Sequence, residues 1–253
     1  MNFRIPLTVV IVALTLFSCK KDDFPTTNGK LLHKIINRWH DSLYYTTLKY
    51  DMQEKLVEIK ATSNNRPLDT STLTISYDSQ NKLIGYTYAQ DQRFQIQSFV
   101  FTYDSDGHII SKVNVGTNVR SQVYSYDKTG RLIADSVFDK RANSIILKTT
   151  FKYDDKNNLI EWQDYYYNIY SKKVENWPVN EVSHHNSINP YTNLGLTLFM
   201  ITDDTHMLSK NNISEVHYNG TIRKYDYEYE SNGLPKKITF NNDHEHYQEF
   251  YYE

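Results

Sequence analysis

The chain has 253 residues, with 28 Lys and Arg against 30 Asp and Glu, so its formal net charge is −2. This balance, without a basic patch or a known reader motif, argues against nucleic acid as a partner. The length suits one large β domain. Because Cys19 is the single Cys, the domain that follows it cannot form an intrachain disulfide.

The first 18 residues have the outline of a signal peptide. Arg4 supplies a positive charge, and residues 7–17 form an apolar run that is too short to span a bilayer comfortably. The run ends in Leu-Phe-Ser-Cys at 16–19, which resembles a lipobox, where a bacterial lipoprotein is cut and then lipidated on its Cys. We therefore expect residues 1–18 to be a lipoprotein signal peptide and Cys19 to anchor the chain to a membrane. An ordinary secretory signal beside a stray Cys is the alternative.

Residues 19–30 form a polar stretch that we interpret as the lipidated Cys and a flexible tether. The short acidic run at Asp22-Asp23 resembles the signal that sends lipoproteins of the Bacteroidota to the outer face of the outer membrane. This resemblance implies an outer membrane lipoprotein exposed at the cell surface. A plain solvated tether on a protein that faces the periplasm is the alternative.

Residues 31–253 form the predicted folded domain, and its first segment is ambiguous. The apolar side chains between residues 30 and 39 fit a helical stripe, and they are Leu31, Leu32, Ile35, Ile36 and Trp39. A strand that leads into the next segment fits the same residues. The pattern alone leaves helix and strand open.

A Tyr-Asp motif then recurs along the chain, and its copies open with Tyr50, Tyr77, Tyr103, Tyr126, Tyr153 and Tyr229. An apolar or aromatic residue usually lies two positions before each Tyr, which places both on one face of a strand. In most copies Asp follows and can start a type I turn, and Gly or Asn four positions after the Tyr tolerates a positive φ. The motif therefore predicts β-hairpins with a G1 bulge. Glu54 fits this position poorly, which leaves the first turn open.

Successive motif Tyr residues are 27, 26, 23, 27 and 76 residues apart, so the last gap is close to three units. Stacked hairpins of this kind must pair into one sheet. On these residues the chain resembles the YD repeats of Rhs-type proteins and, more closely, a family of Bacteroidota lipoproteins of unknown function built from YD-like hairpins. The resemblance covers roughly residues 30–253. It implies a strand at residues 30–39, and no defined activity comes with it.

The repeat is interrupted after Tyr167. Asn189 and Pro190 suit the N-cap and first position of a helix, and an apolar side follows from Leu194 to Leu208, so we expect a helix over about residues 190–208. A sheet of this many strands curls. The predicted fold is mainly β, a long antiparallel meander of YD-type hairpins curled into an open or incomplete barrel, with the inserted helix packed on the sheet.

Aromatic residues cluster at this interruption. Flat rings beside Asn and Asp side chains can hold a sugar ring or another extended ligand. Tyr residues on a thin sheet also serve simply to pack it, which is the competing interpretation. The candidate ligand-binding residues are Trp162, Tyr165, Tyr166, Tyr167, Tyr170, Trp177 and Tyr191.

Metal and catalytic signals are weak. The candidate metal ligands are His184, His185, His244 and His246, and alternate His residues on polar segments are usually surface residues. Residues 104–107, Asp-Ser-Asp-Gly, are similar to the opening of a calcium loop, but position twelve is Val115 and a hairpin turn explains the Asp and Gly equally well. We expect no cofactor, and no catalytic residue is assigned because no nucleophile motif or phosphate loop is present.

The sequence therefore predicts a non-enzymatic envelope protein, anchored through Cys19, that binds a glycan or an envelope protein through an aromatic surface. A purely structural or assembly role is the first alternative. A hydrolase acting on glycans is the second.

Overall fold

The computed structural model describes residues 30–65, 70–90, 96–117, 119–168, 171, 173–191, 194, 199 and 204–253. Cys19 and the tether lie outside these residues. No helix in the described part is long and apolar enough to cross a membrane.

The described residues form 17 strands. These are β1 Leu32–Trp39, β2 Ser42–Tyr50, β3 Leu56–Ser63, β4 Ser71–Tyr77, β5 Leu83–Gln90, β6 Gln97–Tyr103, β7 Ile109–Asn114, β8 Arg120–Tyr126, β9 Leu132–Asp139, β10 Ser144–Tyr153, β11 Leu159–Asn168, β12 Lys173–Asn176, β13 Asn180–Ile188, β14 Asn211–Tyr218, β15 Thr221–Tyr229, β16 Pro235–Phe240 and β17 Asp243–Tyr252.

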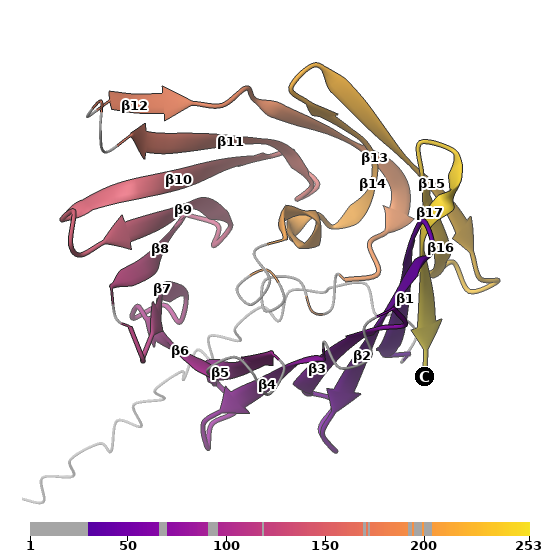
Figure 1. The fold of residues 1–253 in the computed structure, drawn as a ribbon, viewed down its shortest axis with the longest axis horizontal. Coiled ribbons are helices and arrows are strands. Elements are labelled where there is room, and N and C mark those ends of the chain that lie inside the picture. The colour runs from indigo at the N-terminus through magenta and orange to yellow at the C-terminus, as the bar shows by residue number, and fades with distance from the viewer. Residues whose placement is uncertain are drawn as a thin grey trace, which may run out of the picture.

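The sheet closes on itself, as the ring of strands in Figure 1 shows. Each strand pairs antiparallel with its neighbour in sequence, and β1 pairs with both β2 and β17, for example at Ile35 opposite Phe250. Strand β12 pairs beside β11 at one end only, and β11 continues the ring through β13, so 16 of the 17 strands form the barrel. The expected open or incomplete barrel is therefore wrong. Pairing between β1 and β17 removes both edges of the sheet, which would otherwise present unpaired backbone groups.

The first segment is a strand, as the resemblance implied, but the inserted helix at about 190–208 is wrong for the residues described. Pro190 and Tyr191 lie in a turn, where the Asn189 side chain accepts a hydrogen bond from the Tyr191 N–H. Asp204 is extended, and only the single 3-10 turn η1, Thr205–Leu208, follows it. Local cap signals at Asn189 and Pro190 were thus satisfied by a turn instead of a helix.

The repeated motif forms the predicted bulged turn, as Asp127 illustrates. Its N–H donates to the Arg131 carbonyl at 2.9 Å, and its carboxylate accepts from the N–H groups of Thr129 and Arg131. Gly130 has φ +83°, and the register of β8 and β9 shifts next to Tyr126. The first copy uses the same turn, with Glu54 at φ +61°.

Two contacts join each hairpin to the one before it. First, the motif Tyr hydroxyl donates to a backbone carbonyl of the preceding hairpin, in Tyr50 to Leu32 at 2.7 Å, Tyr77 to Leu56 at 2.9 Å, Tyr126 to Ile109 at 2.8 Å and Tyr103 to Leu83. Second, the residue five positions after one motif Tyr covers the next motif ring, as in Lys82 over Tyr103 at 3.6 Å. These contacts hold the turns together along one rim of the barrel, the turn rim.

Side chains fill the interior of the barrel, and among them are those of described residues in the segment that joins β13 to β14. We call this segment, residues 189–210, the inner segment. Its 3-10 turn lies inside the ring in Figure 1. Phe199 is 1 % exposed and meets Phe151 of β10 edge to face at 5.8 Å. Tyr191 meets Phe250 of β17 in the same way at 5.9 Å. The inner segment is therefore part of the core.

Candidate functional site

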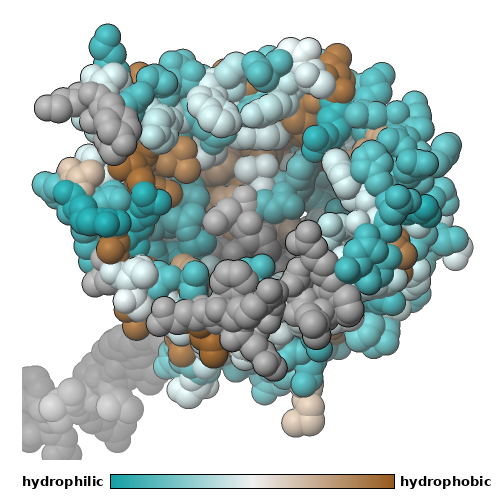
Figure 2. Space-filling view, viewed as in Figure 1, coloured by the Kyte–Doolittle hydropathy of each residue, from teal (hydrophilic) through white to brown (hydrophobic). Residues whose placement is uncertain are grey.

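A cavity of about 220 Å³ remains between the inner segment and strands β14 to β17. We call it the lumen pocket. Figure 2 shows the molecule hollowed inside the ring, beside the wall that includes β13 and β14. The pocket is lined by Asn189, Pro190, Tyr191, Asp204, His206, Ile213, Arg223, Tyr225, Tyr227, Ile238, Phe240 and Gln248.

Asn189 holds the inner segment in place. It is 4 % exposed, and its amide donates to the carbonyls of His206 at 2.8 Å and Ser209 at 3.0 Å. Buried carbonyls need such partners, because losing one costs about 1–3 kcal/mol. The two ends of the segment are thereby joined, which fixes His206 opposite β15.

Asp204, His206 and Tyr225 form a hydrogen-bonded chain across the pocket. The Asp204 carboxylate lies 2.8 Å from His206 Nδ1, and His206 Nε2 lies 3.1 Å from the Tyr225 hydroxyl. Burial raises the pKa of Asp204, but hydrogen bonds from His206 outweigh it and lower that pKa below its usual range. The ionised carboxylate accepts a hydrogen bond from His206 Nδ1, and a second hydrogen bond joins Nε2 to the Tyr225 hydroxyl.

The hydrogen-bonded series Asp204–His206–Tyr225 does not activate a nucleophile. Burial raises the pKa of Tyr225, and the Arg223 guanidinium beside it only partly opposes that rise. A phenol that stays protonated at neutral pH is a hydrogen-bonding group and a poor attacking group. The arrangement suits binding better than catalysis.

Aromatic rings form one wall of the pocket. Tyr225 meets Phe240 edge to face at 5.5 Å, and Tyr227 stacks on Tyr229 at 6.0 Å. Burial raises the pKa of Tyr227, so its hydroxyl is also protonated. Within the described residues, Tyr227 and Gln248 have no hydrogen-bond partner for their side chains. The pocket thus combines flat apolar faces with free polar groups, as small-molecule sites do.

The structure does not bring the predicted aromatic cluster onto one surface. Trp162 and Tyr166 share the inner face of β11, whereas Tyr165 and Tyr167 alternate onto the outer face. Trp177 is 52 % exposed after β12. Tyr191 is the one member that lines the lumen pocket, and Tyr170 lies outside the described residues. A ligand role for the cluster stays a prediction.

Sequence reasoning missed Tyr225, Tyr227 and His206. The two Tyr residues alternate along a strand that ends in the motif residue Tyr229, so they read as packing residues. A usable signal was the pair Asp204 and His206, two residues apart in the segment that interrupts the repeat.

The four candidate His ligands are spread over two strands that are not neighbours. His184 contacts Ser209 Oγ at 3.0 Å, and His185 contacts the Tyr225 carbonyl at 3.2 Å. His246 binds Asp243 at 2.6 Å, and His244 is exposed. Among the described residues, none of the four belongs to a group of three possible metal ligands.

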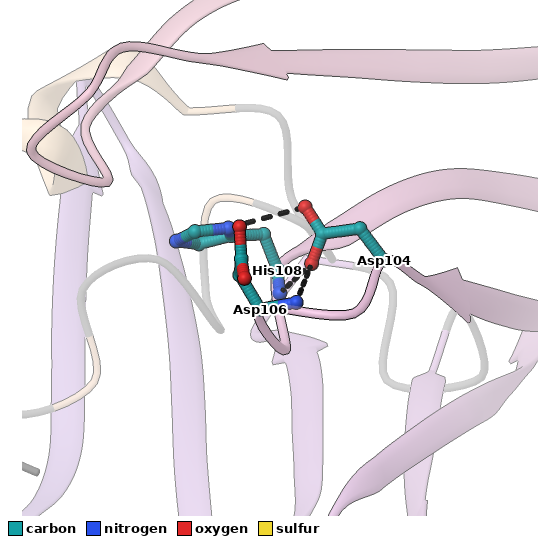
Figure 3. A group of neighbouring side chains, drawn as sticks. All are labelled: Asp104, Asp106 and His108. Carbon is teal, nitrogen blue, oxygen red and sulfur yellow. Dashed lines mark hydrogen bonds and ion pairs between the residues drawn. The ribbon is translucent and has the colours of Figure 1, made fainter. Parts of the chain in front are cut away.

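One such group does occur in the described part of the chain, at Asp104, Asp106 and His108 (Figure 3). The Asp104 carboxylate accepts from the N–H groups of Asp106 at 3.0 Å and His108 at 2.8 Å, and it lies 3.2 Å from His108 Nδ1. Asp51 and Asp127 make the same backbone contacts in turns without a third ligand. The hairpin turn therefore accounts for the group.

Comparison with known proteins shows a shared fold and no family. No protein-family model matches the chain, and no curated protein matches it. A porin-like protein of Bacteroides uniformis is similar at 10 % identity, over 87 % of this chain and 96 % of that one, with a TM-score of 0.62. A porin-like protein of Bacteroides vulgatus matches at 12 % identity over 88 % and 99 %, with a TM-score of 0.43. A Tc holotoxin pore of Photorhabdus luminescens matches at 15 % identity over 83 % of this chain and 9 % of that one, with a TM-score of 0.35. The first likeness is one of barrel fold alone, and the other two carry no argument.

Proposed function

We propose that this chain is a lipid-anchored protein of the cell envelope that binds a small glycan in the lumen pocket without chemical change. The observation that carries the proposal is the pocket itself, where an aromatic wall faces unpartnered hydroxyl and amide groups. Sugars are recognised by such a combination, since rings stack on aromatic faces while hydroxyls pair with polar side chains.

The proposed anchor at Cys19 gives the barrel an orientation. Lys30 forms an ion pair with Glu230 of the Tyr229 turn at 3.5 Å, and the Leu31 N–H donates to the Glu253 carbonyl. The chain therefore enters the barrel at the turn rim. The 12 residues from 19 to 30 are joined by 11 peptide steps and reach at most roughly 40 Å. Under the proposal, the turn rim faces the membrane and the opposite rim faces away from it.

We propose binding without catalysis because the Tyr225 phenol stays protonated. This phenol is the group that the Asp204–His206 pair contacts, and burial keeps it protonated. The lumen pocket is smaller than the roughly 300–1,000 Å³ of drug-sized sites, so it suits one sugar ring or the end of a longer glycan.

The test is a titration of the purified full chain, in mild detergent, with monosaccharides and short glycans, read by calorimetry and by melting temperature. A ligand that binds only the folded state raises its stability by about 2.7 kcal/mol at a hundred times its Kd. Gln248→Leu removes the free amide at similar volume and should weaken binding by up to about tenfold.

The control is Gln163→Leu on the outer face of β11, which should leave affinity unchanged because the Gln163 amide binds the Trp177 carbonyl and the Tyr165 hydroxyl outside the pocket. A chain that binds no saccharide, or equal losses in the two variants, would overturn the proposal and favour a structural role.

A further inference from the structure

We propose that the ligand of the lumen pocket is an acidic sugar whose carboxylate binds Arg223, and that this residue selects acidic over neutral sugars. The inference rests on the proposed function and names the ligand class for the same pocket. It starts from where Arg223 lies and which charges surround it.

Arg223 stands at the mouth of the pocket. It lies opposite Val216 of β14, which is 5 % exposed, and two residues before Tyr225, which is 6 % exposed, so all three side chains share the inner face of the sheet. Arg223 itself is exposed, close to the turn at Asn219 and Gly220 that joins β14 to β15. Its guanidinium therefore borders both the cavity and the solvent.

Several basic side chains of the described barrel have carboxylate partners. Arg131 lies 2.7 Å from Asp127, and Lys224, the neighbour of Arg223 on the outer face, lies 3.5 Å from Glu215. In the described residues, Arg223 has no ion pair. One of its N–H groups binds the Tyr225 hydroxyl. The remaining donors of the planar guanidinium match the two oxygens of a carboxylate.

The charges that line the pocket favour a single anion at this mouth. Among the described lining residues Asp204 is the one acidic side chain, and that carboxylate already accepts two hydrogen bonds from His206. Arg223 carries the fixed positive charge on the other side of Tyr225. An anionic group thus finds its partner at the mouth, away from Asp204.

The interior beyond Arg223 suits a ring that carries hydroxyls. Tyr225 and Phe240 offer faces and edges for stacking, and the Tyr227 hydroxyl and Gln248 amide offer hydrogen bonds. A cavity of about 220 Å³ accommodates one such ring. A monosaccharide with a carboxylate, such as a uronic acid, can bind Arg223 at the mouth and the aromatic interior of the pocket at the same time.

The experiment compares matched sugars by calorimetry on the full chain, glucuronate against glucose and galacturonate against galactose, with acetate as a carboxylate without a ring. One acid should bind about tenfold to a hundredfold more tightly than its neutral partner, the range of a hydrogen bond to a charged group. Acetate should bind far more weakly than either acid, and added salt should narrow the preference.

Arg223→Gln should remove the preference, because it lowers the affinity for the acid far more than the affinity for the neutral sugar. Lys224→Gln, on the opposite face of the same strand, is the matched control and should change nothing. Equal affinity for acid and neutral sugar in the unaltered chain would overturn the inference while the proposed function stands. An equal fall in the affinities for acid and neutral sugar in Arg223→Gln would also overturn it, because Arg223 would then act by positioning Tyr225. Binding of no sugar would remove both proposals.

Discussion

Two parts of the barrel are built differently. Strands β2 to β10, the repeat wall, follow one hairpin pattern, in which Tyr50, Tyr77, Tyr103 and Tyr126 each donate a hydrogen bond to a carbonyl of the hairpin before. Strands β11 and β13 to β17, with the inner segment, form the interrupted wall. The lumen pocket lies in the interrupted wall alone. Repetition thus builds the frame, and the break in repetition leaves space for a site.

The interruption of the hairpin repeat begins at one residue, Asn158. In the repeat wall, the side chain five positions after a motif Tyr covers the next motif ring, as Arg131 covers Tyr153 at 5.4 Å. After Tyr153 that position is Asn158, which is 3 % exposed and accepts the Asn211 N–H at 2.9 Å. The Leu159 N–H donates to Ser209 Oγ. The inner segment therefore occupies the place where the next hairpin would stack.

The largest expected effect tests whether the inner segment is a structural part of the interrupted wall. Phe199→Ala should lower the free energy of unfolding by about 3–5 kcal/mol, because it empties a fully buried site against Phe151. Leu132→Ala in the repeat wall, where Leu132 is 2 % exposed, should cost about 2–5 kcal/mol. Urea denaturation measures both.

Similar losses would mean that the two walls share one core. If Phe199→Ala left the urea midpoint in place while Leu132→Ala lowered it, the inner segment would be a separable lid, and the pocket would not be a fixed feature of the fold.

A smaller effect on the free energy of unfolding should distinguish the hydrogen bonds of the motif Tyr hydroxyls in the two walls. Tyr126→Phe removes a 2.8 Å hydrogen bond to the Ile109 carbonyl and should cost about 0.5–1.5 kcal/mol. Tyr229→Phe, in the interrupted wall, removes only a 3.4 Å contact from the Asn212 amide and should cost less. Equal losses of unfolding free energy in urea denaturation would show that the hydrogen bond of the motif Tyr hydroxyl does not distinguish the walls.

The hairpins could be predicted because turn chemistry is local. Asp127 and Gly130 act within five residues of each other, and their pattern determines the bulge whatever surrounds it. Even Glu54 adopts the required φ, since the strands on both sides over-determine the turn. The closure of the barrel had no comparable local signal in the sequence, because the paired strands β1 and β17 are separated by almost the whole chain.

The site was predicted only in part, for a related reason. The interruption was recognised, and Tyr191 from it does line the pocket. The other aromatic wall comes from β15 and from Phe240 of β16. In β15, alternating Tyr residues serve packing and binding with the same sequence pattern. Only the position of His206 opposite Tyr225, set by tertiary contacts of the inner segment, separates the two uses.

The smallest expected effect is a difference in acid response between the walls. Burial lowers the pKa of His184, in β13, against the opposing effect of Asp154 and with a further lowering by His185. The unfolded chain, with a His pKa of about 6.5, therefore binds the proton first as pH falls. The stability that neutral His184 contributes is complete above about pH 6.5 and is lost as pH falls toward its folded pKa.

The carboxylates of the repeat wall affect stability only at a lower pH than His184 does. Backbone hydrogen bonds from Lys55 and His108 lower the pKa of Asp51 and Asp104, so their contribution to stability falls only below about pH 3.9. At pH 5, hydrogen exchange corrected for its intrinsic pH dependence should thus show β13 and β14 losing protection while β2 and β3 keep theirs. His184→Gln should abolish the difference. Parallel loss in both pairs of strands would instead mean that the barrel opens as one unit, and that the interrupted wall has no separate stability for His184 to control.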